Sequence, residues 1–155
     1  RAALIGAPTQ GAFEAVDWTL EERLARALAP LGLAGVDPAR ALGSLSGGQR
    51  TRAALAAALF DRPDIVLLDE PFSALDARTR ADMQDLAAEA LQGRTVLLVT
   101  HDPAEAARLG QSIVVMTQQG LTPCAPPAAP APRHVDDLET LETQGALLKL
   151  QREAA

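Results

Sequence analysis

A short segment of the chain combines residue types that suit phosphate binding. Directly before a helix-favouring stretch, residues 45–50 read LSGGQR, with candidate ligand-binding groups at Ser46, Gly47, Gly48 and Gln49. Glycines permit backbone angles that other residues avoid, so this segment could bring bare amide groups against a ligand. A helix N-terminus adds unpaired N–H donors and a partial positive charge, which together bind phosphate. A Gly-rich turn between two helices has the same composition, so the motif alone leaves both interpretations open.

Acidic and imidazole side chains follow two later apolar runs. Asp69 and Glu70 end the first run, and His101 follows the second. Side chains at the carboxyl ends of parallel strands lie where α/β folds bind ligands, and alternation along a strand would separate the two carboxylates. Each residue also has a simpler explanation: a solvated charged pair, or a helix cap for His101. Asp76 is predicted to be the N-cap of the helix that follows it.

Hydrophobic patterns place these residues on alternating helices and strands. The patterns predict helices over 19–32, from 37, from the glycine motif to about 60, over 77–92, from 102 and near the C-terminus. They predict strands at 65–68, 95–100, 112–116 and 121–124. Short continuous apolar runs are typical of strands buried on both faces, and alternation with helices favours parallel pairing in an α/β fold.

Composition limits the class of protein. The chain has 155 residues, 48% of them hydrophobic but only 3% aromatic, which predicts one domain with an aliphatic core. Its net charge of −6 argues against a nucleic-acid surface, and its single cysteine, Cys124, excludes an internal disulfide. No apolar run approaches the roughly 18 residues that span a bilayer. These features predict a soluble, cytoplasmic protein.

Three segments, LSGGQR, IVLLDEPFSALD and LLVTHD, together resemble the nucleotide-binding domain of ABC (ATP-binding cassette) ATPases. The resemblance covers residues 45–102 in the family order, and its five-residue signature is highly specific. It implies a partial P-loop NTPase-like α/β fold: a helical subdomain followed by the C-terminal part of a mainly parallel sheet with flanking helices. It also implies ATP and Mg²⁺ as ligands, and ATP hydrolysis as the activity.

The resemblance implies a role for the residues of the signature and of the segment SALD. Ser46, Gly47, Gly48 and Gln49 would contact the γ-phosphate of an ATP bound by an opposing subunit. Asp76 would lie at the interface between the two subunits, in the family's D-loop.

The resemblance also implies the roles at the two strand ends. Asp69 would hold Mg²⁺ through water, as in a Walker B strand. Glu70 would polarise the attacking water as general base, and His101 would bind the γ-phosphate and that water. Phosphoryl transfer depends chiefly on positioning and charge neutralisation, which suits these residue types.

The chain departs from the family pattern upstream of the signature. It contains no GxxxxGK[ST] loop, and its single lysine, Lys149, stands in a predicted C-terminal helix. No aromatic residue is a candidate for stacking on adenine, and Gln10 is a poor candidate for the family's glutamine loop. We therefore expect a C-terminal piece of a cassette that does not hydrolyse ATP alone. We also expect it to be marginally stable or to associate, because the missing strands leave apolar surface exposed.

The resemblance implies a domain organisation. Residues 1–44 would be part of the helical subdomain and 45–121 the C-terminal part of the ATPase core. A Pro-rich linker would occupy 122–134, because its composition favours neither helix nor sheet. Residues 135–155 would form a C-terminal helix.

The segments DEPFSALDARTR and THDPAEAARLG look most like importer cassettes. The tail resembles cassettes of nitrate, sulfonate, taurine and hydroxymethylpyrimidine importers, and a thiamine precursor is our preferred solute among these. The implied partners are a second ATPase subunit in a homodimer, a transmembrane permease and, indirectly, a solute-binding protein. The implied location is the inner face of the plasma membrane, with no nucleic acid bound. Two alternatives stay open: an ABC ATPase of DNA repair or translation, and a non-catalytic remnant that binds a partner subunit.

Overall fold

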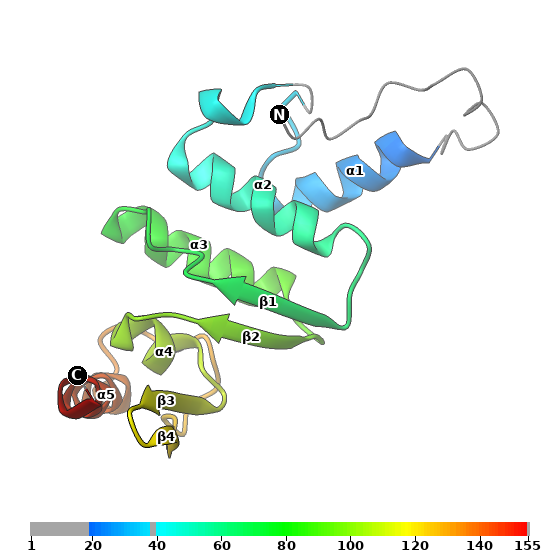
Figure 1. Ribbon diagram of the computed structural model, residues 1–155. Coiled ribbons are helices and arrows are strands. Elements are labelled where there is room, and N and C mark those ends of the chain that lie inside the picture. The colour runs from blue at the N-terminus through cyan, green and yellow to red at the C-terminus, as the bar shows by residue number, and fades with distance from the viewer. Residues whose placement is uncertain (1–18, 38–39, 155) are drawn as a thin grey trace.

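The computed structural model describes residues 19–37 and 40–154 (Figure 1). The candidate glutamine-loop residue, Gln10, lies outside these ranges. The helices are α1 (Leu20–Leu28), α2 (Gly47–Leu59), α3 (Ala77–Ala90), α4 (Pro103–Leu109) and α5 (Leu138–Ala154), with 3-10 segments η2 (Ala29–Leu31) and η3 (Leu42–Ser44). The strands are β1 (Ile65–Asp69), β2 (Thr95–Val99), β3 (Ile113–Thr117) and β4 (Gly120–Cys124).

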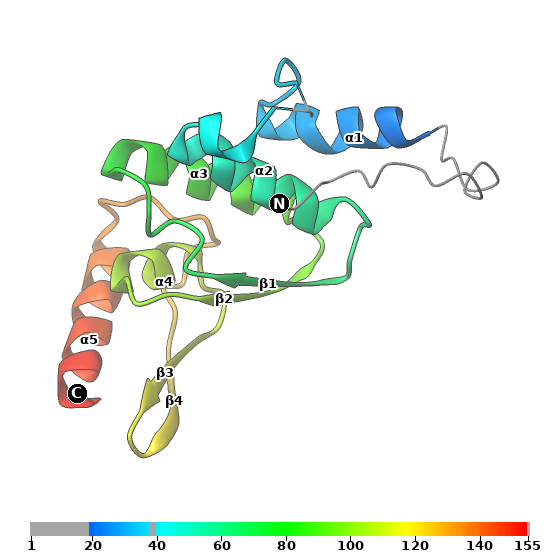
Figure 2. The ribbon, with the colours of Figure 1, turned by 45° about the horizontal axis from the view of Figure 1, so that its top comes forward.

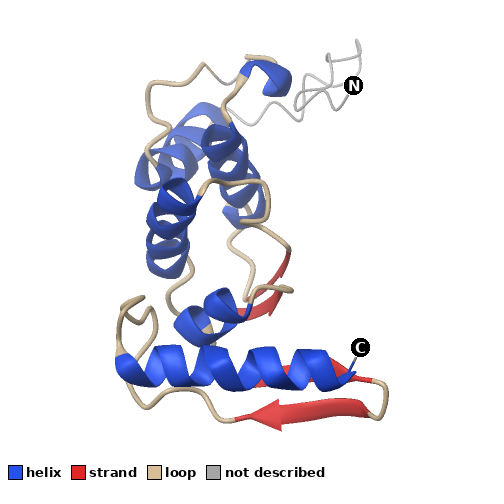
Figure 3. Cartoon of the chain, turned by 90° about the vertical axis from the view of Figure 1, so that its left-hand side faces the viewer, coloured by secondary structure: helices blue, strands red, loops and turns tan. Residues whose placement is uncertain are grey.

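The elements are arranged in layers around the strand pair β1–β2. Helices α1, α2 and α3 lie on one side of this pair, and the β3–β4 hairpin extends away on the other (Figures 1 and 2). Helix α5 packs against α4 and β3 near the base of the molecule (Figure 3). The structure is therefore α/β, and its four strands and the helices α1 to α5 follow one another in the order that the sequence predicts.

The strands form two separate pairs. β1 and β2 are parallel, with Ile65 beside Thr95 and Asp69 beside Val99. The prediction of parallel pairing is wrong for the third strand, because β3 pairs antiparallel with β4. A two-residue loop follows Thr117 and Gly120 has a φ of +120°, so the chain turns back at once into a hairpin.

The larger of two hydrophobic clusters among the described residues lies on one face of β1. Val66 on this strand is buried with Leu55 of α2, Met83 of α3 and their neighbours. The prediction that the strands are buried on both faces is wrong for the described residues. Leu67 is 63% exposed and Leu97 is 60% exposed, because the described helices cover only the opposite face.

Two details of the N-terminal helices also differ from expectation. Thr19 and Glu22 have the spacing of a capping box, but the Thr19 side chain makes no capping hydrogen bond at the start of α1. The predicted helix from 37 falls partly outside the described residues, and Arg40 and Ala41 are not helical. There the Arg40 side chain donates to the hydroxyl and carbonyl of Ser44 at 2.9 and 3.1 Å, which favours a compact turn.

The Pro-rich segment is an ordered strap rather than a free linker. Its expected first residues, 122–124, form the end of β4. Arg133 is buried, and its guanidinium group donates to four carbonyl oxygens, at Pro127, Ala129, Ala107 and Gly110. This side chain satisfies the carbonyls at the end of α4 and holds residues 125–137 against that helix.

A second buried arginine extends the same arrangement to α3. The Arg108 side chain donates to the Arg133 carbonyl at 3.0 Å, to Gln84 at 2.7 Å and to the Asp85 carboxylate at 2.6 Å. The Arg133 amide in turn donates to the Arg108 carbonyl at 3.0 Å. The two arginines thus connect α3, α4 and the strap.

None of the helices in the described ranges combines the length and the apolar composition that a bilayer crossing requires.

We expect Arg133→Met to lower the free energy of unfolding by about 3 kcal/mol, because several buried carbonyls would lose their donor. Chemical denaturation of the chain, followed by circular dichroism, measures this loss. Arg152→Met is the matched control: its side chain is exposed on α5, so the change should stay within about 0.5 kcal/mol. Equal effects of the two substitutions would contradict the role given to Arg133.

Candidate functional site

The carboxyl ends of β1 and β2 lie side by side, as the parallel register requires (Figure 1). The ladder continues one residue beyond β1, where the Glu70 amide donates to the Val99 carbonyl at 2.9 Å. This bond places Glu70 next to the residues that follow β2. Glu70 and His101, which the sequence analysis names separately as site residues, are therefore brought together by backbone pairing.

Glu70 and His101 are in direct contact. The His101 Nδ1 atom lies 2.5 Å from Glu70 Oε1, and the His101 amide donates to the same oxygen at 2.9 Å. The Glu70 side chain is 33% exposed and that of His101 is 78% exposed, so the contact faces solvent. One carboxylate oxygen thus fixes both the ring and the backbone of His101.

The charge of Glu70 changes the titration of His101. The hydrogen bond from the ring to Glu70, together with the negative charge of that carboxylate, raises the pKa of His101 above its ordinary value. The charges of Asp102 and Glu105 act in the same direction. The imidazolium form therefore persists to higher pH in the folded chain than in the unfolded chain.

The backbone of Glu70 has an unusual conformation. Its φ is +47°, in the left-handed region that non-glycine residues rarely adopt. The Ser73 hydroxyl donates to the Glu70 carbonyl at 3.0 Å and holds the turn. Asp69 and Glu70 were expected to diverge through strand alternation. Instead Asp69 is the last strand residue, and Glu70 leaves the strand in a left-handed turn.

Asp69 stands exposed at the end of β1. Across the described ranges, no group of three or more His, Cys, Asp or Glu side chains could hold a metal ion. Mg²⁺ in nucleotide sites is commonly bound by one or two carboxylates together with substrate phosphates and water. Asp69 fits such a site only if a phosphate supplies further ligands.

The signature segment forms the N-terminus of α2. Ser46 is the N-cap: its hydroxyl accepts from the Gln49 amide at 3.2 Å, and its own amide donates to Gln49 Oε1 at 3.0 Å. These reciprocal bonds form a capping box, which the Ser-x-x-Gln spacing could have predicted. The side chains expected to contact phosphate therefore engage each other in this structure.

The two signature glycines serve a purpose other than the expected one. Both lie in the first turn of α2, and neither has a positive φ. The expectation of unusual backbone angles is wrong here. A Cβ on Gly48 would lie 3.1 Å from the Thr79 methyl carbon, so the missing side chain lets α2 approach α3 closely.

The same first turn leaves donors available. In the described part of the chain, the amides of Gly47 and Gly48 have no hydrogen-bond acceptor. They lie at the positive end of a 13-residue helix, an arrangement that favours a phosphate ligand.

Asp76 is the N-cap of α3, as predicted. Its Oδ1 atom accepts from the Thr79 amide at 3.0 Å, and this hydrogen bond lowers the pKa of Asp76. The alternative prediction of a cap at His101 is wrong, because Asp102 caps α4 by accepting from the Ala104 amide at 2.9 Å.

The structure keeps the two halves of the predicted site apart. Among the described residues, no hydrogen bond or ion pair joins the Ser46–Gln49 segment to Glu70 or His101. Lys149 is exposed on α5, outside both halves.

Sequence reasoning missed several residues that hold the His101 loop. Thr100 and Glu105 lie within four positions of His101. The position of Glu105, three residues after the N-cap Asp102, could have indicated a role at the start of α4. Gln151 donates to the His101 carbonyl at 3.2 Å from α5. No local pattern indicates Gln151, because fifty positions separate it from His101.

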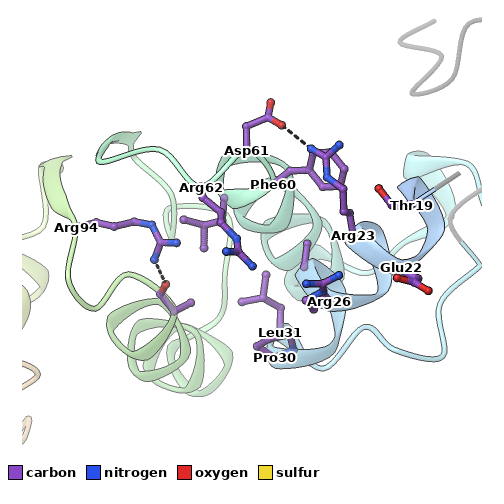
Figure 4. Close-up of a pocket in the computed structure, with 13 residues that line it drawn as sticks. Thr19, Glu22, Arg23, Arg26, Pro30, Leu31, Phe60, Asp61, Arg62 and Arg94 are labelled. Carbon is purple, nitrogen blue, oxygen red and sulfur yellow. Dashed lines mark hydrogen bonds and ion pairs between the residues drawn. The ribbon is translucent and has the colours of Figure 1, made fainter. Parts of the chain in front are cut away.

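A cavity of about 590 Å³ lies elsewhere, between α1 and the C-terminal ends of α2 and α3 (Figure 4). Arg23, Arg26, Arg62 and Arg94 line it, with Leu31 on its apolar side. Arg26, Arg62 and Arg94 each lie near a helix C-terminus, where a positive charge offsets the helix dipole. These arginines have a structural explanation, and the cavity does not include the strand ends.

Comparisons with known proteins agree with the motifs. The ABC transporter family matches residues 7–73. An uncharacterized ABC transporter ATP-binding protein of Haemophilus influenzae is 51% identical over 107 residues, covering 64% of this chain and 45% of that protein. The aliphatic sulfonates import ATP-binding protein SsuB 1 of Rhodococcus jostii is 46% identical over 132 residues, covering 82% and 52%. The thiamine import ATP-binding protein ThiQ of Ruegeria sp. is 44% identical over 110 residues, covering 70% and 46%.

A solved structure shares the fold. It is described as a metal-chelate type ABC transporter in an inward-facing conformation, and it matches with a TM-score of 0.60 at 24% identity. The match covers 79% of this chain and 46% of that chain. This chain spans about half the length of the curated relatives that it matches.

We expect Glu70→Gln to lower the pKa of His101 towards its ordinary value, because the amide removes the charged acceptor. An NMR titration of the His101 ring measures this directly. The contact should stabilise the fold below the unfolded pKa of histidine, and this contribution should disappear as pH rises through the raised folded pKa.

Glu153→Gln, on the exposed surface of α5, is the matched control and should leave the His101 titration unchanged. A His101 titration that is the same in the Glu70→Gln variant as in the parent chain would contradict the contact.

Proposed function

We propose that this chain, which belongs to the ABC transporter family of ATP-binding proteins, is part of the ATP-hydrolysing subunit of an importer. The observation that carries the proposal is the contact between Glu70 and His101 at the ends of two parallel strands. Family membership supports it, since the relatives include ATP-binding proteins of sulfonate and thiamine import.

The geometry suggests how Glu70 acts as general base. Both the ring and the backbone amide of His101 are hydrogen-bonded to Glu70 Oε1, whereas Glu70 Oε2 has no protein partner within the described ranges. Oε2 is therefore the oxygen that accepts a proton from the attacking water. His101 orients this carboxylate and, as an imidazolium, places a positive charge beside the γ-phosphate.

ATP supplies the phosphoryl group, and Mg²⁺ would neutralise its charge. In our assignment the exposed carboxylate of Asp69 would hold the metal through water, and phosphate oxygens would supply further ligands. This chain contains no GxxxxGK[ST] loop, so it supplies only part of the ATP site. The chain alone should therefore not turn over ATP.

The signature segment would bind the nucleotide of a second subunit. The free amides of Gly47 and Gly48 give α2 two donors for a γ-phosphate, with Ser46 and Gln49 beside them. We place Asp76 at the same interface, because it begins the helix that Gly48 approaches.

The domain assignment follows the same reasoning. We propose that residues 1–44 belong to a helical subdomain and 45–121 to the ATPase core. In this scheme the Pro-rich segment to 134 and the helix from 135 form a C-terminal extension that packs on α4.

The proposed partners are a second copy of the subunit, a transmembrane permease and, through the permease, a solute-binding protein. The subunit would then act in the cytoplasm, at the inner face of the plasma membrane, without binding nucleic acid. Relatives named for aliphatic sulfonates and for thiamine both match, so we propose a small organic solute of one of these classes.

Two substitutions in the complete protein test the proposed roles. Glu70→Gln should bind Mg-ATP, lose hydrolysis and accumulate as an ATP-bound dimer, because the amide keeps the shape without the base. Ser46→Arg should stay monomeric with ATP, because its long side chain fills the space beside the phosphate.

Size-exclusion chromatography with and without Mg-ATP separates these outcomes. A monomeric Glu70→Gln variant beside a dimeric Ser46→Arg variant would overturn the assignment.

A further inference from the structure

The buried carboxylate of Glu105 lies next to the turn that carries His101 (residues 100–102), and no role has been assigned to it above. We propose that Arg80, together with this carboxylate of Glu105, is a positioning residue that fixes the Phe72–Asp76 loop relative to His101. The inference rests on the proposed function, because it gives Arg80 a part in the same reaction.

Glu105 is only 3% exposed, and its carboxylate has both a hydrogen-bond donor and a cationic neighbour. The Thr100 hydroxyl donates to Glu105 Oε2 at 2.8 Å, and the Arg80 Nε atom lies 3.7 Å from Oε1. The Glu105 side chain is buried whereas that of Arg80 is 32% exposed, so removal of Arg80 would leave a desolvated carboxylate without its cationic neighbour. Glu105 thus needs both Thr100 and Arg80 in place.

Thr100 connects this carboxylate to the turn that presents His101. Its hydroxyl oxygen accepts from the Asp102 amide at 3.1 Å while it donates to Glu105. The residues on both sides of His101 are therefore held by one hydroxyl group, and its orientation depends on Glu105.

Arg80 connects the same carboxylate to the loop that follows Glu70. Its guanidinium group donates to the Leu75 carbonyl at 2.9 Å and to the Phe72 carbonyl at 3.4 Å. Another of its nitrogens lies 3.6 Å from the Asp102 carboxylate. A planar guanidinium can reach backbone carbonyls and two carboxylates at once, which a lysine ammonium cannot.

These contacts form a continuous physical connection. It runs from the Phe72–Asp76 loop through Arg80 to Glu105, and from there through Thr100 to the His101 turn. Since Asp76 is assigned to the subunit interface, a displacement of that loop on dimer closure would reach His101 by this route. Arg80 acts through other residues and is not itself a catalytic residue.

The test compares variants of the complete protein in steady-state ATP hydrolysis. Arg80→Met should lower kcat about tenfold or more with KM for ATP within about twofold, because misplaced groups slow the chemical step. Arg80→Lys should recover only part of kcat, because it keeps the charge without the planar fork. Arg78→Met, an exposed arginine on the same turn of α3, should match the parent.

A second measurement reads the position of His101 without activity. Thr100→Val removes the hydroxyl without changing charge, so the negative charges that face His101, at Glu70, Asp102 and Glu105, are retained. The NMR titration midpoint of His101 should then fall, because the ring loses its fixed position against Glu70. The Thr100→Val titration also tests the inference if the Arg80→Met variant fails to fold.

The outcomes separate this inference from the proposed function. If the parent hydrolyses ATP and Arg80→Met has the same kcat as Arg78→Met, the positioning role is wrong. An unchanged His101 titration in Thr100→Val would also overturn it. A complete parent protein that binds ATP without hydrolysing it would instead overturn the proposed function, whatever the titration shows.

Discussion

The arrangement of the site depends on the parallel register of β1 and β2. Because Asp69 pairs with Val99, both strands end at the same level and the residues after them must meet. A shift of one residue would move every side chain to the opposite face of the strand and separate Glu70 from His101. The left-handed backbone of Glu70 completes the approach, because it directs the carboxylate towards the turn after β2.

Other contacts hold the N-terminus of α2, the turn at His101 and the strap in place around this strand pair. Gly48 lets the N-terminus of α2 approach Thr79 at the start of α3, and Arg80 on the same helix reaches the residues behind His101. The strap held by Arg133 secures the far end of α4. In the proposed function, contacts of this kind would hold the groups of a phosphoryl-transfer site in place, and such a site works mainly by positioning.

The sequence predicted what local patterns determine. Asp76 as a helix cap, the parallel pairing of β1 and β2, and the position of Glu70 and of His101 after a strand follow from short-range chemistry and from strand direction. It did not predict what depends on tertiary neighbours. The role of Gly48 depends on Thr79, and the burial of Arg133 depends on its contacts with the end of α4. The exposure of Leu67 depends on which helices cover the sheet. The sequence does contain a turn after β3 that allows antiparallel pairing, but the alternation of helices and strands favoured a prediction of parallel pairing.

The central claim is that one ATP lies between Ser46 of one subunit and Glu70 of another. Cysteine crosslinking in the complete protein tests it, with every native cysteine, Cys124 included, replaced by serine as the background and a short bis-maleimide as the reagent. A mixture of Ser46→Cys and Glu70→Cys proteins should give a crosslinked dimer only with Mg-ATP. Crosslinking within single chains that carry both cysteines, with no ATP-dependent dimer from the mixture, would contradict the account.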